Sequence, residues 1–192
     1  MGTFEYITAL VAVVLGLAIA DMVTSLHKLL RNRRRVRWDW VAPLAALVIL
    51  VEIFNLWWSW RKFTGDSMAE VAPYFFVLVL LFLTASATLP DEVPEDGVDL
   101  GRYFDENRGY FLTLYGTYII LWIGMWTIRD IVQGASFPDL LRNYSFDYPW
   151  IIGCFTLVFV RPRWISGLFL LITLFWLLYG FGWWDKPLTA PA

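Results

Sequence analysis

The chain has 192 residues, of which 59% are hydrophobic and 19% aromatic. Both fractions exceed those of a typical soluble domain, so the composition indicates a membrane protein. The net charge of −2 says little as a sum, because the charges are sorted by position along the chain. We expect no nucleic-acid partner. The single cysteine, Cys154, excludes an intrachain disulfide, and the single histidine, His27, excludes a haem held between two histidines.

Six apolar stretches fill most of the sequence, and they lack the strict alternation of membrane β-strands. Only helices and closed barrels satisfy the backbone in lipid. We therefore predict one transmembrane domain over residues 1–192, an all-α polytopic bundle of six spanning helices. Their predicted bounds are Phe4–Leu29, Asp39–Trp60, Val71–Leu89, Tyr110–Ile131, Tyr148–Val160 and Trp164–Trp184.

The fifth stretch is short for a full crossing. Between Asp147 and Arg161 a helix would rise roughly 20 Å, whereas the hydrocarbon core is about 30 Å thick. Two alternatives stay open at this point. Either its charged ends snorkel while the bilayer thins, or the segment is a half-helix that enters and returns.

Most lysines and arginines fall on one side of the predicted bundle if the N-terminus is outside. The positive-inside rule then predicts that both termini face outward. The arginine-rich segment Arg31–Arg37 dominates this asymmetry, and its alternative role is a patch for anionic lipid.

Two connecting segments are long. The acidic inner loop, residues 90–109, lacks the ordered spacing of a calcium loop. We expect it to be a solvated linker that leads into a short helix near Leu100–Phe104. The outer segment Gln133–Phe146 contains several apolar residues, and it is predicted to form a short interfacial helix.

Small residues recur at four-residue intervals along the first predicted helix. This helix-packing face consists of Ala12, Gly16 and Ala20, with Thr8 and Thr24 at its ends. Such a stripe lets another helix approach closely in lipid. The partner helix could belong to the same chain, to a second copy in a homo-oligomer or to another membrane protein.

Glu52 is the sharpest polar feature of the sequence. It lies within roughly 5 Å of the predicted midplane of the second helix. Asn55 and Ser59 follow on the same face, so all three should point into the bundle or an aqueous cavity. Two interpretations stay open. Glu52 either handles a proton or cation, or it is a protonated acid that donates a hydrogen bond to a neighbouring helix.

Asp21 is the second candidate residue of this intramembrane polar site. Lys28 shares its helix face and is its expected local partner. The depth offset from Glu52 is roughly 10 Å. We therefore expect no direct contact between the two acids, although a water or hydroxyl chain could bridge them.

Common signatures of membrane enzymes are absent. The sequence contains no His-Glu-x-x-His helix, no Gly-x-Ser-x-Gly elbow and no glycine-rich phosphate loop. Asp21 and Glu52 differ in depth, which disfavours an aspartyl protease. We therefore assign no catalytic, cofactor or metal residues, and an enzyme is the less favoured class.

Four groups of segments together form a familiar pattern. They are Phe4-Glu5-Tyr6-Ile7 with Gly16-Leu17, Arg33–Arg37 into Trp38, Glu52-Ile53-Phe54-Asn55-Leu56-Trp57-Trp58, and Asp99-Leu100-Gly101-Arg102-Tyr103-Phe104 into Tyr110-Phe111. In these segments the chain resembles a broad set of uncharacterised bacterial integral membrane proteins of about this length. The resemblance implies a bacterial cytoplasmic membrane and no specific activity. It also implies that glutamine takes the place of Glu52 in many of these proteins, which favours a polar interhelical contact over an obligatory proton carrier.

The sequence leaves two main hypotheses for function. The first is a non-enzymatic multi-pass protein that binds or moves a small ligand or ion around Glu52, surrounded by membrane lipids. The alternative is an accessory or sensory subunit that binds another membrane protein through its helix faces. An intramembrane enzyme is a weaker third option.

Overall fold

The computed structural model describes residues 3–60, 68–145, 147–160 and 162–179. The described residues are mostly helical, which confirms the all-α class. The last part of the predicted sixth helix, residues 180–184, lies outside the described residues. The elements are α1 (Thr3–Arg31), β1 (Val36–Arg37), α2 (Val41–Trp60), α3 (Met68–Ser86), β2 (Val98–Asp99), α4 (Leu100–Val132), α5 (Phe137–Asn143), α6 (Tyr148–Phe159) and α7 (Arg163–Tyr179).

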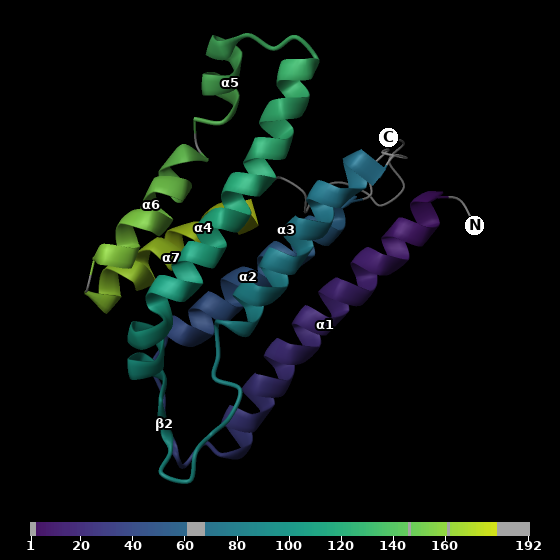
Figure 1. Cartoon of the computed structure of the whole chain (residues 1–192). Helices are drawn as coiled ribbons and strands as arrows, with labels where there is room; N and C mark the ends of the chain where they lie inside the picture. Colours follow the sequence, from purple (N-terminus) through teal and green to yellow (C-terminus); the bar gives the residue numbers. More distant parts are fainter. Residues whose placement is uncertain (1–2, 61–67, 146, 161, 180–192) are drawn as a thin grey trace.

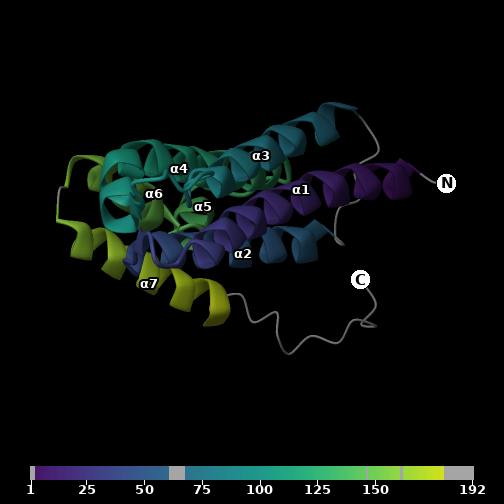
Figure 2. The same ribbon diagram turned by 90° about the horizontal axis from the view of Figure 1, so that it is seen from below.

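The long helices form two layers, seen from below in Figure 2. One layer holds α6, α4 and α3, and the other holds α7, α2 and α1. Contacts between α1 and α3 and between α2 and α4 join the layers. Parallel strands β1 and β2 pair below the helices in Figure 1. We call this end of the bundle, with β1, β2 and the first residues of α2, α4 and α7, the charged end.

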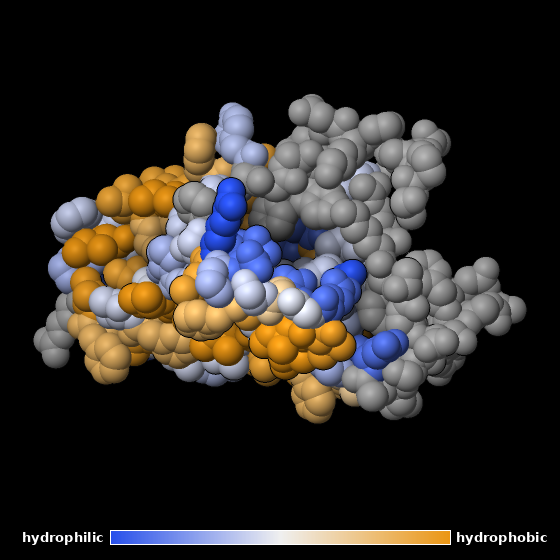
Figure 3. Space-filling view, turned by 90° about the horizontal axis from the view of Figure 1, so that it is seen from above, coloured by the Kyte–Doolittle hydropathy of each residue, from blue (hydrophilic) through white to orange (hydrophobic). Residues whose placement is uncertain are grey.

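Three of the described helices, α1, α2 and α4, are long and apolar enough to cross a membrane. Shorter apolar helical segments cover Glu70–Ser86 of α3, Tyr148–Phe159 of α6 and Arg163–Tyr179 of α7. The view onto the end opposite the charged end shows hydrophobic residues along much of the flank and hydrophilic residues nearer the centre (Figure 3). These features support a membrane protein, while the count of six spans stays a prediction.

Helix α4 corrects one predicted boundary. It begins at Leu100 and continues to Val132, so the short helix expected near Leu100–Phe104 is the first part of one 33-residue helix. Asp99 caps it by accepting a hydrogen bond from the backbone N–H of Arg102 at 3.0 Å. This bond holds the pKa of Asp99 below its ordinary value. The prediction failed because charged side chains in the first turns hid the helix from a search for apolar stretches.

The predicted short helix in the segment 133–146 is confirmed as α5. Ser136 and Asp139 form a capping box at its start, which satisfies backbone N–H groups that the helix leaves open. Leu140 is buried against the protein, whereas Phe137 is 71% exposed, so the helix also presents an apolar side chain at the surface. Its position at a membrane interface stays a prediction.

Helices α2 and α7 pack closely at the charged end because Gly167 has no side chain. A Cβ atom at this position would lie 2.2 Å from the Trp40 ring. The indole therefore occupies the space over Gly167. This contact brings the start of α7 against the start of α2.

Candidate functional site

The carboxyl group of Glu52 is enclosed between α2 and α4. Glu52 is only 9% exposed. The hydroxyl of Tyr115 donates a hydrogen bond to Glu52 Oε1 at 2.8 Å, and Tyr118 is a second hydrogen-bonding partner. The Tyr115 and Tyr118 rings stack with centroids 6.1 Å apart. The acid is therefore held by protein groups, in agreement with the predicted inward direction of its face.

Cys154 of α6 closes a third side of this region. A Cβ atom added at Gly116, the residue after Tyr115, would lie 3.1 Å from Cys154 Cβ and 2.9 Å from the Phe155 ring. The absence of a side chain at Gly116 thus lets α6 pack directly on α4 beside the tyrosines. Cys154 is fully buried.

The sequence did not identify the two tyrosines, and the reason is the register of α4. Arg163 binds Asp39 and Asp105 together at the charged end. Glu52 is 13 residues after Asp39, and Tyr118 is 13 residues after Asp105. Each distance is roughly 20 Å along a helix, so the groups meet at one depth. The predicted helix began at residue 110 and left Asp105 outside it, so the equal depth of Glu52 and Tyr118 could not be recognised from the sequence.

Asn55 lies one turn after Glu52 on α2 and is 8% exposed. Its amide nitrogen is buried and has no hydrogen-bond partner among the described residues. Ser59, the third predicted member, is half-buried, and its hydroxyl donates to the Leu56 carbonyl of the same helix at 2.8 Å. The predicted stripe thus contains one held acid, one open amide donor and one satisfied hydroxyl.

Asp21 has a different partner from the one the sequence suggested. Its Oδ2 atom accepts a hydrogen bond from Ser86 of α3 at 2.6 Å. Lys28 instead donates to the Asp91 carbonyl oxygen at 2.7 Å. The predicted pairing of Asp21 with Lys28 is therefore wrong, because α3 packs against this face of α1 and offers a closer donor. Asp21 belongs to the α1–α3 contact.

The small-residue face of α1 is exposed in the described chain. Ala12, Gly16 and Ala20 are all exposed, and a Cβ atom at Gly16 would have no neighbour within 4 Å. Together with Phe54 and Trp57 of α2, Ala12 and Gly16 line a mostly apolar groove of about 490 Å³. The residues that α1 buries lie on a neighbouring face and are Val11, Leu15, Ala18, Met22, Ser25 and Leu29. A close partner for the stripe would have to come from outside the described residues.

This exposure yields a testable expectation for Gly16→Leu. The added side chain has room in the described chain, so the melting temperature of the monomer in detergent should change by less than about 2 °C. If a second copy packs on the stripe, the same substitution should convert the oligomer to monomer in size-exclusion chromatography with light scattering. Leu17→Ala, on the adjacent exposed position, is the matched control. A large loss of monomer stability would contradict the exposed position of Gly16.

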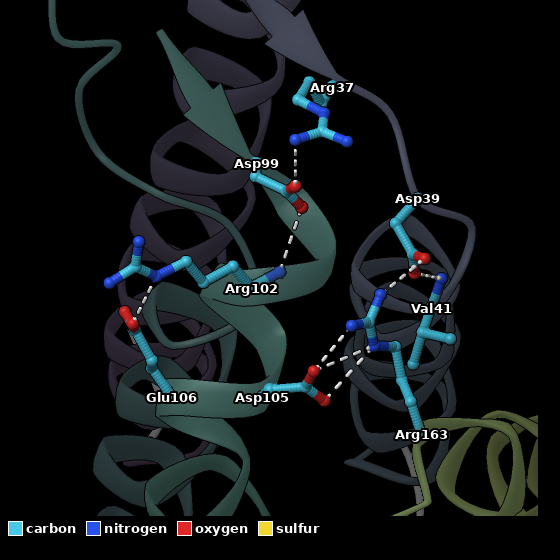
Figure 4. Close-up of polar contacts among 8 residues, drawn as sticks. All are labelled: Arg37, Asp39, Val41, Asp99, Arg102, Asp105, Glu106 and Arg163. Atoms are coloured by element: carbon cyan, nitrogen blue, oxygen red, sulfur yellow. Dashed lines mark hydrogen bonds and ion pairs between the residues drawn. The ribbon is translucent and has the colours of Figure 1, made fainter. Parts of the chain in front are cut away.

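At the charged end, the guanidinium group of Arg163 binds two carboxylates from different helices, as shown in Figure 4. Arg163 Nη1 lies 3.0 Å from Asp39 Oδ2, and Nη2 lies 2.6 Å from Asp105 Oδ2. Asp39 also accepts the backbone N–H of Val41 at 2.9 Å, which caps α2. A Cβ at Gly101 would lie 2.0 Å from Arg163 Nη1, so the glycine leaves the room that the guanidinium occupies. One side chain thus connects the starts of α2, α4 and α7.

Within the described residues, no group of three or more His, Cys, Asp or Glu side chains is placed to hold a metal ion. Searches of protein-family models, curated proteins and solved structures found no match to this chain. Inferences about function therefore rest on the site itself.

Proposed function

We propose that this chain is a multi-pass protein of a bacterial cytoplasmic membrane that binds or moves a small ion or polar molecule at Glu52 and Asn55. The observation that carries the proposal is the buried Asn55 amide nitrogen, which has no hydrogen-bond partner in the part of the chain that the structure describes and lies one turn from Glu52. A buried polar group left unpaired costs about 1–3 kcal/mol. Native proteins rarely retain such a group without an ion, a water molecule or a ligand to pair with it.

The two residues offer complementary chemistry on one face of α2. Asn55 supplies N–H donors, and Glu52 supplies carboxyl oxygens. Tyr115 and Tyr118 already direct hydroxyl groups at the acid. If Glu52 releases a proton, these donors solvate the resulting charge, and a small cation can replace the proton. An ionisable residue at membrane depth is a functional candidate on energetic grounds alone.

The proposed topology has six crossings, with both termini outside and the charged end in the cytoplasm. Helices α5 and α6 follow one another alongside α4 in Figure 1. With 7 and 12 residues, they rise together by roughly 28 Å. This is close to the hydrocarbon thickness of about 30 Å. In place of the interfacial position expected for α5, we therefore propose that α5 and α6 together form the fifth crossing as a broken helix. That arrangement would account for the short apolar stretch of α6.

The substitution Asn55→Leu tests whether the Asn55 amide binds a ligand or stabilises the fold. The substitution removes the amide while it keeps the number and branching of side-chain heavy atoms, so it should raise the stability of the ligand-free protein by about 1 kcal/mol. It should also abolish any thermal stabilisation by an added ion. Melting curves in detergent with and without Na⁺, K⁺, ammonium or methylammonium would measure both effects. A destabilised Asn55→Leu protein would show that the amide is paired, which contradicts the proposal.

Movement of an ion requires a separate measurement. In proteoliposomes that contain a pH-sensitive dye, the wild-type protein should dissipate an imposed proton or cation gradient faster than empty vesicles. Glu52→Gln keeps an acceptor for the tyrosines but cannot ionise, so it should fold and lose this flux. Equal flux from wild type and Glu52→Gln would contradict a role for the carboxylate. Ser59→Ala, a satisfied hydroxyl on the same helix, is the control.

One observation favours the accessory-subunit alternative. The small-residue face of α1 is open, and the groove beside it is lined by apolar residues of α1 and α2. A transmembrane helix of a partner protein would bury this face. Under this alternative, Gly16→Leu would abolish co-purification of that partner, whereas Glu52→Gln would leave it intact.

A further inference from the structure

A second candidate site lies at the charged end, in a surface cavity of about 350 Å³ beside the β1–β2 pair. Its walls are held by backbone contacts. Val98 N–H donates to the Arg35 carbonyl at 3.0 Å, and Gly97 turns the chain with φ of 94°. A Cβ atom at Gly97 would lie 2.4 Å from the same carbonyl oxygen. The approach of the two segments that shape the cavity therefore depends on glycine.

The cavity carries equal numbers of opposite charges. Its basic side chains are Arg35, Arg37 and Arg102, and its acidic side chains are Asp96, Asp99 and Glu106. A purely anionic ligand would meet three carboxylates here, and a purely cationic one would meet three guanidinium groups. The ligand that complements such a surface carries both charges.

Four of the six charges already form pairs, which are drawn in Figure 4. Arg102 pairs with Glu106 at 2.7 Å, and Arg37 pairs with Asp99 at 3.5 Å. Arg35 and Asp96 form no ion pair within the described residues. The cavity therefore presents one unpaired guanidinium and one unpaired carboxylate. The existing pairs are exposed and are worth little, so a ligand can exchange them at small cost.

The Glu106 side of the cavity lies at the depth of the lipid headgroup layer, whereas Arg102 and Asp99 lie farther toward the charged end, roughly 12 and 16 Å from Tyr110. Tyr110 is an exposed aromatic residue at the start of the apolar part of α4, where tyrosine typically marks a membrane interface. Glu106 lies one turn before it, roughly 6 Å nearer the charged end. The headgroup layer on each side is about 5–8 Å thick. The ligand groups in this layer are phosphates and amines.

From these observations we infer that the cavity binds a phosphate ester joined to a primary ammonium group, the chemistry of a phosphatidylethanolamine headgroup. Arg35 and Arg102 receive the phosphate, for which guanidinium groups provide paired N–H donors. Asp96 accepts hydrogen bonds from the ammonium. The inference does not depend on the function proposed for Glu52.

Native mass spectrometry of the purified full chain tests this inference with three added lipids. Phosphatidylethanolamine should be retained at least about tenfold more strongly than phosphatidylglycerol, which lacks the ammonium. Phosphatidylcholine should also bind more weakly, because its trimethylammonium cannot donate hydrogen bonds to Asp96. Equal or stronger retention of phosphatidylglycerol, or no retention of any lipid, would overturn the inference.

Substitutions of single cavity residues test which side chains bind the headgroup. Arg35→Gln should weaken retention of phosphatidylethanolamine about tenfold, whereas Arg34→Gln, the same charge change outside the cavity, should not. Asp96→Asn should weaken the retention of phosphatidylethanolamine, whose ammonium loses its acceptor. It should strengthen the retention of phosphatidylglycerol, because the carboxylate that repels its phosphate is removed. Equal losses in Arg34→Gln and Arg35→Gln would indicate non-specific attraction and overturn the site. Soluble O-phosphoethanolamine in a thermal-shift assay distinguishes the source, since stabilisation at millimolar concentration would assign the same site to a free phosphate ester.

Discussion

Replacing Arg163 with alanine is expected to lower the free energy of unfolding of the purified protein by about 2 kcal/mol. The substitution removes hydrogen bonds to two carboxylates and leaves Asp39, whose side chain is 20% exposed, without its cation. The side chain of Arg163 is itself 36% exposed, so solvent moderates the loss. Chemical or thermal unfolding in lipid-free detergent measures the difference. The loss should shrink in high salt, because salt screens partly exposed charges.

The matched control for this prediction is Arg102→Ala. Arg102 also pairs with a carboxylate, Glu106, but its side chain is 78% exposed and the pair lies within one helix. Its loss should cost no more than about 0.5 kcal/mol. Arg163→Lys should fall between wild type and alanine, because one ammonium cannot match the paired donors that a guanidinium gives Asp39 and Asp105. If Arg163→Ala and Arg102→Ala unfold alike, the three helix starts are not held by this contact.

The second large effect is expected from Glu52→Ala, which should cost about 1–3 kcal/mol. The substitution leaves the hydroxyl groups of Tyr115 and Tyr118 without their acceptor and opens a cavity between α2 and α4. Glu52→Gln should cost less than about 1 kcal/mol, because its amide oxygen still accepts a hydrogen bond.

A compensating variant distinguishes lost hydrogen bonds from lost volume. The triple substitution Glu52→Leu, Tyr115→Phe and Tyr118→Phe removes all three polar groups while it retains most of the packing. It should recover most of the stability that Glu52→Ala loses, since no buried hydroxyl is left unpaired. If the triple variant is as unstable as Glu52→Ala, the carboxyl–hydroxyl contact does not account for the stability of this region. Unfolding by thermal melts under one detergent condition would compare all four proteins.

These experiments separate stability from function at the same residue. Glu52→Gln should be nearly as stable as wild type yet unable to exchange a proton, so a loss of flux in this variant cannot be attributed to unfolding. Asn55→Leu has the opposite character, with raised stability and lost binding. Together the two variants test whether the buried polar groups bind an ion or hold two helices together.

The sequence by itself determined the class of this protein and the direction of its most polar helix face. Lipid requires every backbone group to bond within the chain, so long apolar stretches without alternation can only be helices. The same constraint turns Glu52 and Asn55 away from hydrocarbon, whatever their neighbours are. Local patterns also sufficed for α5, because the apolar residues of its segment predicted a short helix, and the structure adds the capping box at its start.

Only the tertiary structure decided which groups meet. Tyr115 and Tyr118 reach Glu52 because Arg163 aligns Asp39 with Asp105, and that alignment depends on residues more than fifty positions apart. The exposure of Gly16 was likewise decided by which face of α1 the other helices cover. Apolar periodicity specifies that a helix has a buried side, but it does not encode the lateral partner, the rotation or the axial register of two packed helices. Those three quantities come from side-chain packing between segments distant in the chain.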